Sequence, residues 1–198
     1  MAIPSWRGSP KATNRREARQ VFDLADLSKN DIFYDVGCGD GFVCIQAARR
    51  CKCSVGIEDL KIRAKRAARN VSKSGLSNVK IIPKKYQKVR IRGRNIVLFT
   101  VNDLSFEDFE KWNRRSDGRN FRIVTYGPPA VPIKPAAKKG SFFLTKFPYS
   151  LAKTDAELCY AVTRKRNASL KHVIRKLKSV FEPDDLRQYV KDFRRHFR

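Results

Sequence analysis

A short glycine-rich segment constrains the fold of this chain more than any other feature. Residues 35–41 read Asp-Val-Gly-Cys-Gly-Asp-Gly, where the apolar run of residues 32–36 ends and a helical pattern over residues 42–50 begins. Glycines permit a tight turn and let a ligand approach the backbone, while the start of a helix offers free N–H groups. The segment therefore predicts a ligand-binding turn between a buried strand and a helix.

A carboxylate follows where a nucleoside ligand would need one. Glu58 lies 23 residues after Asp35, at the end of a second predicted strand over residues 54–57. A carboxylate at that strand end can accept hydrogen bonds from both hydroxyls of a ribose. Strand, glycine turn, helix, strand and acid together indicate a nucleoside-binding α/β unit.

The rest of the chain repeats this alternation of strand and helix, which predicts an α/β fold with a mostly parallel sheet. Two further runs, 142–149 and 158–162, are predicted to form an antiparallel pair at the sheet edge, after a proline-rich loop over residues 127–141. The predicted strands are 32–36, 54–57, 79–82, 95–101 and 121–126, and the predicted helices are 14–27, 42–50, 62–74 and 106–112.

Three parts are expected along the 198 residues. Residues 1–12 form an N-terminal arm, residues 13–163 form the α/β domain, and residues 164–198 form a basic tail of two amphipathic helices. With 44 Lys and Arg against 19 Asp and Glu, the chain carries a net charge of +25. This excess favours a polyanionic partner such as RNA or the ribosome, against the alternative of a merely solvated surface.

The five cysteines do not form a disulfide framework, because four of them crowd into residues 38–53. We therefore expect a reducing compartment, the cytoplasm. No Cys/His cluster has the spacing of a zinc site, so no metal is expected. No apolar run reaches the length of a membrane-spanning helix, and residues 1–10 lack the apolar core of a signal peptide.

The segment from Asp35 to Gly41 resembles motif I of the class I S-adenosylmethionine-dependent methyltransferases. The resemblance implies a Rossmann-like sheet with an antiparallel edge, and S-adenosylmethionine as the cofactor. It implies that Glu58 binds the ribose and that Asp59 belongs to the second motif. It also implies a contact from the segment before the first helix, where Thr13 stands. The residues that would line the cofactor in the glycine segment are Asp35, Gly37, Cys38, Gly39, Asp40 and Gly41.

Residues 30–41, 54–58 and 95–101 are similar to the archaeal protein-lysine methyltransferases and to the mitochondrial ATP synthase c-subunit lysine methyltransferase group. The similarity extends from Thr13 to Val162 and implies a protein lysine as the methyl acceptor. With the positive charge, it suggests a protein substrate in a ribosomal or nucleic-acid-bound particle. Desolvation beside the sulfonium would lower the pKa of the acceptor lysine without a dedicated base. Phe99, Tyr126 and Phe147 are either walls of the acceptor channel or plain core residues.

Two departures from the superfamily pattern keep alternatives open. After the third predicted strand the chain has Pro-Lys-Lys-Tyr, with no acid for the adenine amino group, which leaves backbone groups, Tyr86 or no contact at all. After the fourth, Phe99 and the residues that follow lack the Asp-Pro-Pro-Tyr type of motif that nucleic-acid amino-methylating enzymes use. An RNA methyltransferase and a non-catalytic basic binding protein on this scaffold are therefore the alternatives to a protein-lysine enzyme.

Overall fold

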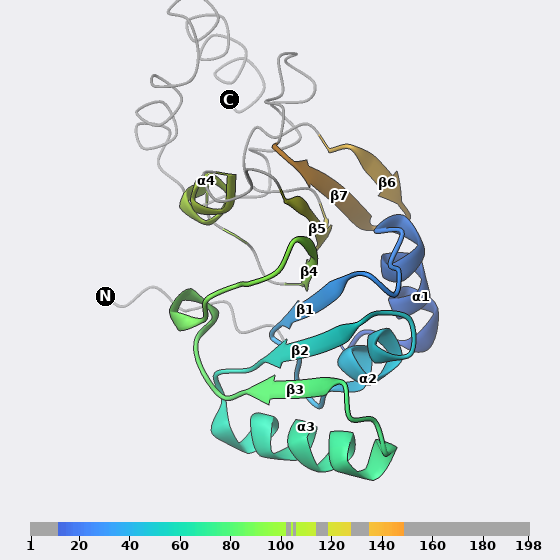
Figure 1. Cartoon of the computed structure of the whole chain (residues 1–198), viewed down its shortest axis with the longest axis vertical. Helices are drawn as coiled ribbons and strands as arrows, with labels where there is room; N and C mark the ends of the chain where they lie inside the picture. The colour runs from blue at the N-terminus through green and yellow to red at the C-terminus, as the bar shows by residue number, and fades with distance from the viewer. Residues whose placement is uncertain (1–11, 102–103, 105, 114–118, 128–134, 149–198) are drawn as a thin grey trace, which may run out of the picture.

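The computed structural model describes residues 12–101, 104, 106–113, 119–127 and 135–148. They form one seven-stranded sheet in the order β3-β2-β1-β4-β5-β7-β6 (Figure 1). The first five strands of that order pair in parallel, and β7 runs antiparallel to both β5 and β6. The strands are β1 (Ile32–Val36), β2 (Cys53–Ile57), β3 (Val79–Ile82), β4 (Asn95–Thr100), β5 (Asn120–Tyr126), β6 (Ala137–Lys139) and β7 (Phe142–Phe147).

The strand order reverses beside β1, which pairs with β2 on one edge and with β4 on the other. In open α/β sheets, ligands bind beyond the carboxyl ends of the strands at such a reversal point. The glycine-rich segment leaves β1 at this edge. The topology therefore places it where the sequence predicted a ligand-binding turn.

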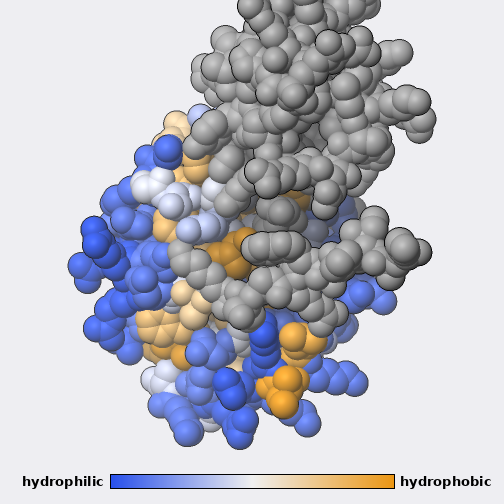
Figure 2. Space-filling view, turned by 180° about the vertical axis from the view of Figure 1, so that it is seen from behind, coloured by the Kyte–Doolittle hydropathy of each residue, from blue (hydrophilic) through white to orange (hydrophobic). Residues whose placement is uncertain are grey.

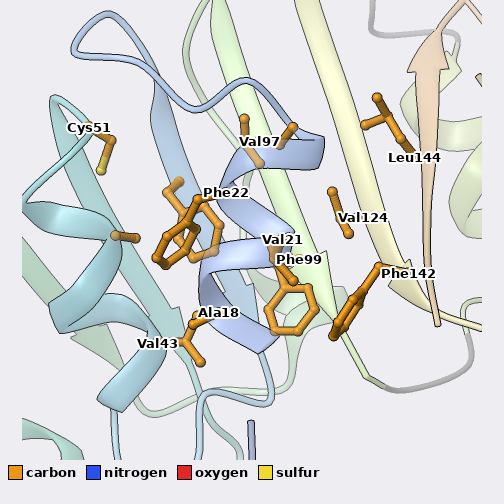
Figure 3. Packing of buried hydrophobic residues seen from close by; sticks show 13 residues of the cluster. Ala18, Val21, Phe22, Val43, Cys51, Val97, Phe99, Val124, Phe142 and Leu144 are labelled. Carbon is orange, nitrogen blue, oxygen red and sulfur yellow. The ribbon is translucent and has the colours of Figure 1, made fainter. Parts of the chain in front are cut away.

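Helices cover both faces of the sheet (Figure 1). One face packs against α1 (Arg15–Leu24) and α2 (Phe42–Ala48), and α3 (Lys61–Ser74) lies beside α2 and β3. The core between this face and its helices includes Phe22, Phe33, Phe99 and Phe142, and part of it is drawn in Figure 3. The other face packs against α4 (Phe106–Asn113) and the β3–β4 connection.

Local sequence explains where the first helix begins and where α3 ends. Asn14 caps α1: its side chain accepts a hydrogen bond from the Glu17 N–H at 3.0 Å, and the Glu17 carboxylate accepts one from the Asn14 N–H at 3.0 Å. Gly75 ends α3 at a φ of 69°, the left-handed conformation that glycine adopts without strain. The start of α1 and the end of α3 agree with the predicted helices over residues 14–27 and 62–74.

A buried ion pair fixes the orientation of α1. Arg122 on β5 donates hydrogen bonds to the carboxylate of Asp31 and to the carbonyl oxygens of Ala25 and Asp26, just after α1. The end of α1 is therefore held near the start of β5. Gln20, earlier in α1, lies beside Gly140, next to the carboxyl end of β5, so the helix runs from that edge of the sheet toward the opposite one.

The antiparallel edge is confirmed, but its pairing differs from the prediction. The neighbours of β7 are β5 and β6, not residues 158–162, which lie outside the described residues. Strand β6 falls inside the segment that the sequence predicted as loop. Its three residues are exposed and carry no apolar alternation, so no strand pattern marks them. The predicted N-terminal arm and basic tail also lie outside the described residues, apart from residue 12 of the arm. Within the described ranges, no helix is long and apolar enough to cross a membrane.

Candidate functional site

The glycine loop, residues 37–41, is bound to the end of the neighbouring strand. The N–H groups of Gly37 and Cys38 both donate to the carbonyl oxygen of Ile57, at 2.8 and 3.1 Å. The three glycines have φ values of 82°, 58° and 82°, which non-glycine residues rarely adopt. The loop is therefore a fixed turn at the carboxyl edge of β1 and β2.

Glu58 ties this loop to the segment that follows β2. One carboxylate oxygen accepts a hydrogen bond from the Gly39 N–H at 3.0 Å, and the other accepts one from the Leu60 N–H at 3.1 Å. The residue is only 5% exposed. Because each carboxylate oxygen has two lone pairs, both retain capacity for a further donor. The sequence singled out Glu58 for a ligand but did not predict that it also holds the glycine loop.

Two of the glycines have different surroundings. A Cβ atom on Gly41 would lie 3.2 Å from the Cβ of Ala67, so this glycine lets α3 pack against the loop. A Cβ atom on Gly39 would meet no atom of the described residues within 4 Å. Among these residues, Gly39 therefore borders open space, and its N–H donates to the carboxylate of Glu58.

Asp35 is a buried carboxyl group directly beneath the loop. It is 3% exposed, and the thiol of Cys44 donates to its Oδ2 at 3.7 Å. Burial raises the pKa of Asp35 to about 7, and the nearby charges of Glu58 and Asp40 act in the same direction against the hydrogen bond from Cys44. A cationic group placed next to Asp35 would favour its ionised form.

Sequence reasoning missed Cys44 and Gly56, which complete the support beneath the loop. A Cβ atom on Gly56 would lie 2.7 Å from Cys38 Sγ and 2.9 Å from Cys44 Sγ, so this glycine makes room for the two thiols. The pKa of the Cys44 thiol is raised well above its ordinary value, first by its hydrogen bond with Cys38 and then by burial. It stays a protonated donor. A glycine inside the predicted strand 54–57 was the available signal.

The two other acids of the site lie at its rim. Asp40 Oδ1 accepts a hydrogen bond from the Phe42 N–H at 3.1 Å, and the Asp40 carbonyl accepts one from the Asn70 side chain at 2.9 Å. Asp59 is exposed next to Glu58. The structure thus brings together the predicted residues from Asp35 to Gly41 with Glu58 and Asp59.

The three remaining predicted residues lie outside the loop and the segment that follows β2. Thr13 is half-buried immediately before the cap of α1. Tyr86, in the short 3-10 helix η1 (Tyr86–Lys88), turns toward α4 and donates its hydroxyl to Asp108 at 2.7 Å. Phe99 pairs with Asp35 in the strand register, but its ring is 1% exposed and packs edge-on against Phe142 (Figure 3).

The three aromatic residues considered for an acceptor channel occupy both faces of the sheet. Phe99 and Tyr126 both contact the ring of Phe142 on the α1 face. Phe147 stacks on Phe109 of α4 on the opposite face. They are core residues of two layers and do not line a common channel. Among the described residues, no group of three metal-ligating side chains comes together.

Comparison with known proteins identifies this arrangement. The sequence profile of the family described as "Histone methylation protein DOT1" matches residues 12–103. A protein-lysine N-methyltransferase of Saccharolobus islandicus is 32% identical over 129 residues, which cover 60% of this chain and 80% of that protein. An uncharacterized RNA methyltransferase of Chlorobaculum tepidum is 36% identical over 70 residues, but these cover only 14% of its length.

Solved structures agree on the fold. The structure of an RNA methyltransferase from Salinibacter ruber, in complex with S-adenosyl-L-homocysteine, matches with a TM-score of 0.58 at 20% identity. The match covers 73% of this chain and 98% of that one. The archaeal relative and the geometry of the site together show that the chain belongs to the class I S-adenosylmethionine-dependent methyltransferases. Its cofactor is S-adenosylmethionine.

Proposed function

We propose that this enzyme methylates a lysine side chain of a protein, with the cofactor held on the glycine loop. The observation that carries the choice of acceptor is the extent of the archaeal match. It spans 80% of a protein-lysine N-methyltransferase, whereas the RNA methyltransferase relatives match over only 14% and 19% of their lengths. A match of that length requires only that the two proteins share the cofactor-binding half of the domain.

The described residues fit the cofactor at three points. The open space above Gly39 would admit a ligand against the backbone, because no atom of the described residues occupies it. Glu58 retains lone pairs for the ribose hydroxyls. Asp35 is a buried carboxyl group that a cation such as the methionine ammonium would stabilise in its ionised form. Gly37, Cys38, Gly41, Asp40 and Asp59 complete the rim.

In this proposal, three residues outside the glycine loop also contribute to the cofactor site. Thr13 lies at the carboxyl edge, where the start of α1 points, and would close over the cofactor. Tyr86 follows β3, the strand beside β2, and would contact the adenine side through its ring or the neighbouring backbone, since Asp108 already accepts its hydroxyl proton. Phe99 supports Asp35 from the adjacent strand as a packing residue.

The charge of the site suits a cationic acceptor. The cofactor supplies an activated methyl group on its sulfonium, so the protein must position the nucleophile and exclude water. Asp35, Asp40, Glu58 and Asp59 gather four carboxyl groups at one edge of an otherwise basic chain. A lysine ammonium is attracted to such an edge, and must then lose its proton, because its ordinary pKa is about 10.4.

RNA is the alternative acceptor, favoured by the RNA methyltransferase relatives and by the charge of +25. In either case we propose a contact with RNA or the ribosome. If the acceptor is a protein, that protein would be part of a ribonucleoprotein, because a free basic protein would be repelled by this enzyme.

The test is methyl transfer from radiolabelled S-adenosylmethionine to a cell extract. The reaction products are divided and digested with nuclease or with protease, and the labelled protein is hydrolysed to amino acids. We expect label that survives nuclease and elutes as methyl-lysine. Label that is lost on nuclease treatment would overturn the lysine assignment in favour of RNA. A Gly39→Val variant, whose side chain would fill the open space, provides the background measurement.

A further inference from the structure

The described surface is dominated by charge rather than by apolar patches. Figure 2 shows hydrophilic residues over most of the coloured part of one side of the molecule, with smaller hydrophobic patches between them. Among the described residues, the exposed large hydrophobic side chains are Leu60 and Ile62, which flank the cofactor site. A strongly basic segment lies elsewhere, in the β3–β4 connection.

Basic and apolar residues alternate in the second half of this connection. Residues 83–94 contain six Lys or Arg and no Asp or Glu. From Lys88 onward, basic residues alternate with Val89, Ile91 and Gly93. Every basic residue of this stretch is exposed, while Val89 and Ile91 are half-buried and pack against the core cluster of the α4 face. The connection therefore lies on the sheet with its apolar side chains inward and its cations outward.

Contacts with the core fix the connection in place. The Tyr34 hydroxyl donates to the Arg92 carbonyl at 3.0 Å and accepts from the Arg92 N–H at 3.1 Å. Gly93 lies directly on Ile32, where a Cβ atom would come within 2.9 Å of its Cδ1 atom. Tyr86, at the other end, is bonded to Asp108 of α4. The cations are thus displayed from a backbone that the sheet holds.

An open groove runs between this connection and the end of α4. The charged residues among its lining are all positive: Lys88, Arg90, Arg92, Lys111 and Arg119. Beside it lies a much smaller hollow whose walls include Asp108 and the buried core residues Trp112 and Phe121, so it has no room for a base. We call the open groove the basic groove.

We propose that the basic groove is a docking site for single-stranded RNA, separate from the glycine loop. Closely placed cations neutralise phosphates and release counterions, which supplies affinity without reading sequence. A single strand of RNA presents phosphates at regular intervals along its backbone, which fits a groove lined by closely placed cations. The net charge of +25 also favours a polyanion of high charge density over an acidic protein segment. The groove serves docking, so it requires no particular methyl acceptor.

The test compares two triple variants of the full chain that lose the same charge. One replaces Lys88, Arg90 and Arg92 with alanine. The matched control replaces Lys65, Arg66 and Arg69 with alanine, all exposed on α3. Binding of a fluorescent single-stranded RNA of about 12 nucleotides is measured by anisotropy at several salt concentrations. S-adenosylmethionine binding is measured for each variant as the check on folding.

We expect the groove variant to lose RNA affinity by about tenfold or more at low salt. Its salt slope should fall by about 2, since each lost phosphate contact removes about 0.7. The α3 control should stay within about threefold of the native affinity, and both variants should bind S-adenosylmethionine like the native chain. Equal losses in the two triple variants would overturn the proposal, because the binding would then reflect net charge alone. If neither the native chain nor the two variants bind S-adenosylmethionine, the cofactor site is contradicted. The comparison of RNA binding between the two variants would still test the basic groove.

One further measurement addresses the class of polyanion. Polyglutamate that displaces the RNA at equal concentration of charge would overturn the proposal in favour of an acidic protein partner.

Discussion

The glycine loop and the β3–β4 connection carry opposite charge on one small sheet. Asp35, Asp40, Glu58 and Asp59 surround the loop, whereas residues 83–94 have six cations and no carboxylate. The first region gathers acids in a chain of net charge +25, and the second exposes cations along a groove. The contrast agrees with the proposal that the enzyme takes a cationic acceptor at its carboxyl edge and contacts a polyanion elsewhere.

The two regions also differ in how they are built. The loop is held by backbone hydrogen bonds to Ile57 and by the buried carboxylate of Glu58, so a change there affects both loop shape and ligand space. The basic side chains of the β3–β4 connection point outward from a backbone anchored by Tyr34. Charge can therefore be removed from the groove with little cost to the fold. The following predictions use this difference.

The largest effect is expected from Gly39→Val. The valine side chain would occupy the open space above the loop, and we expect S-adenosylmethionine affinity to fall by more than about hundredfold, roughly 2.7 kcal/mol. Gly75→Val is the matched control, since Gly75 also has a positive φ and open space around its Cβ position but ends α3 away from the loop. Calorimetry measures both variants. Equal losses in the two would mean that backbone strain, not ligand space, explains the effect.

A smaller effect is expected from Glu58→Ala. The change removes the acceptor for the Gly39 and Leu60 N–H groups and for the ribose. Charged hydrogen bonds contribute about 1.5–3 kcal/mol, so cofactor affinity should fall roughly ten- to hundredfold. Asp26→Asn removes the same charge from an exposed residue at a φ of 50°, which asparagine tolerates, and should leave affinity unchanged. A native dissociation constant for Glu58→Ala would remove Glu58 from the site.

The pH dependence of cofactor binding should reveal Asp35. Because its pKa is raised to about 7 by burial, the ionised form that attracts a cation accumulates as the pH rises. Affinity for S-adenosylmethionine should therefore increase by about eightfold from pH 6 to pH 7.5. Asp35→Asn should bind weakly at both values. A native enzyme whose affinity does not change over this range would contradict a direct role for Asp35.

The Asp35 carboxyl group should also affect the stability of the fold, and this effect should change with pH in the direction opposite to cofactor affinity. A folded-state pKa above the unfolded value means that the protonated form stabilises the fold. This contribution is complete below about pH 4 and is lost as the pH rises through 7. Asp35→Asn, which cannot ionise, should therefore melt at a higher temperature than the native protein at pH 8, and by a smaller margin at pH 5. Lower melting temperatures at both values would show that the carboxyl group is needed for packing instead.

The smallest effect is expected from Tyr34→Phe. The variant loses both hydrogen bonds to the Arg92 backbone while keeping the buried ring. We expect about 1 kcal/mol less stability and a few-fold weaker RNA binding, with native cofactor affinity. Chemical unfolding and RNA anisotropy measure the two quantities. Weaker cofactor binding with unchanged RNA binding would contradict the separation of the two regions.

The sequence predicts the cofactor half of the sheet well because its signals are local. The strands around the glycine loop, the cap at Asn14 and the end of α3 at Gly75 all depend on neighbouring residues. Strand β6 could not be predicted in the same way, because its exposed residues gain their structure from pairing with β7.

Within the site, sequence identified the residue types but not their contacts. The bond from the Gly39 N–H to Glu58 and the packing of Cys38 and Cys44 against Gly56 join segments that only the fold brings together. The same holds for Tyr34, which anchors Arg92 across 58 residues. The alternation of basic and apolar residues after Lys88 was visible in the sequence. Its consequence depends on which side of the β3–β4 connection faces the sheet, and the sequence does not specify that.

Hydrogen–deuterium exchange of the full chain tests the account most directly. It is measured for the protein alone, with saturating S-adenosylhomocysteine, and with saturating single-stranded RNA. We predict that S-adenosylhomocysteine slows exchange in residues 37–41 and 58–60 and leaves residues 87–93 unchanged, whereas RNA slows exchange in residues 87–93 and leaves the glycine loop unchanged. Unaltered exchange in residues 37–41 with S-adenosylhomocysteine bound elsewhere would contradict the central claim that the glycine loop holds the cofactor.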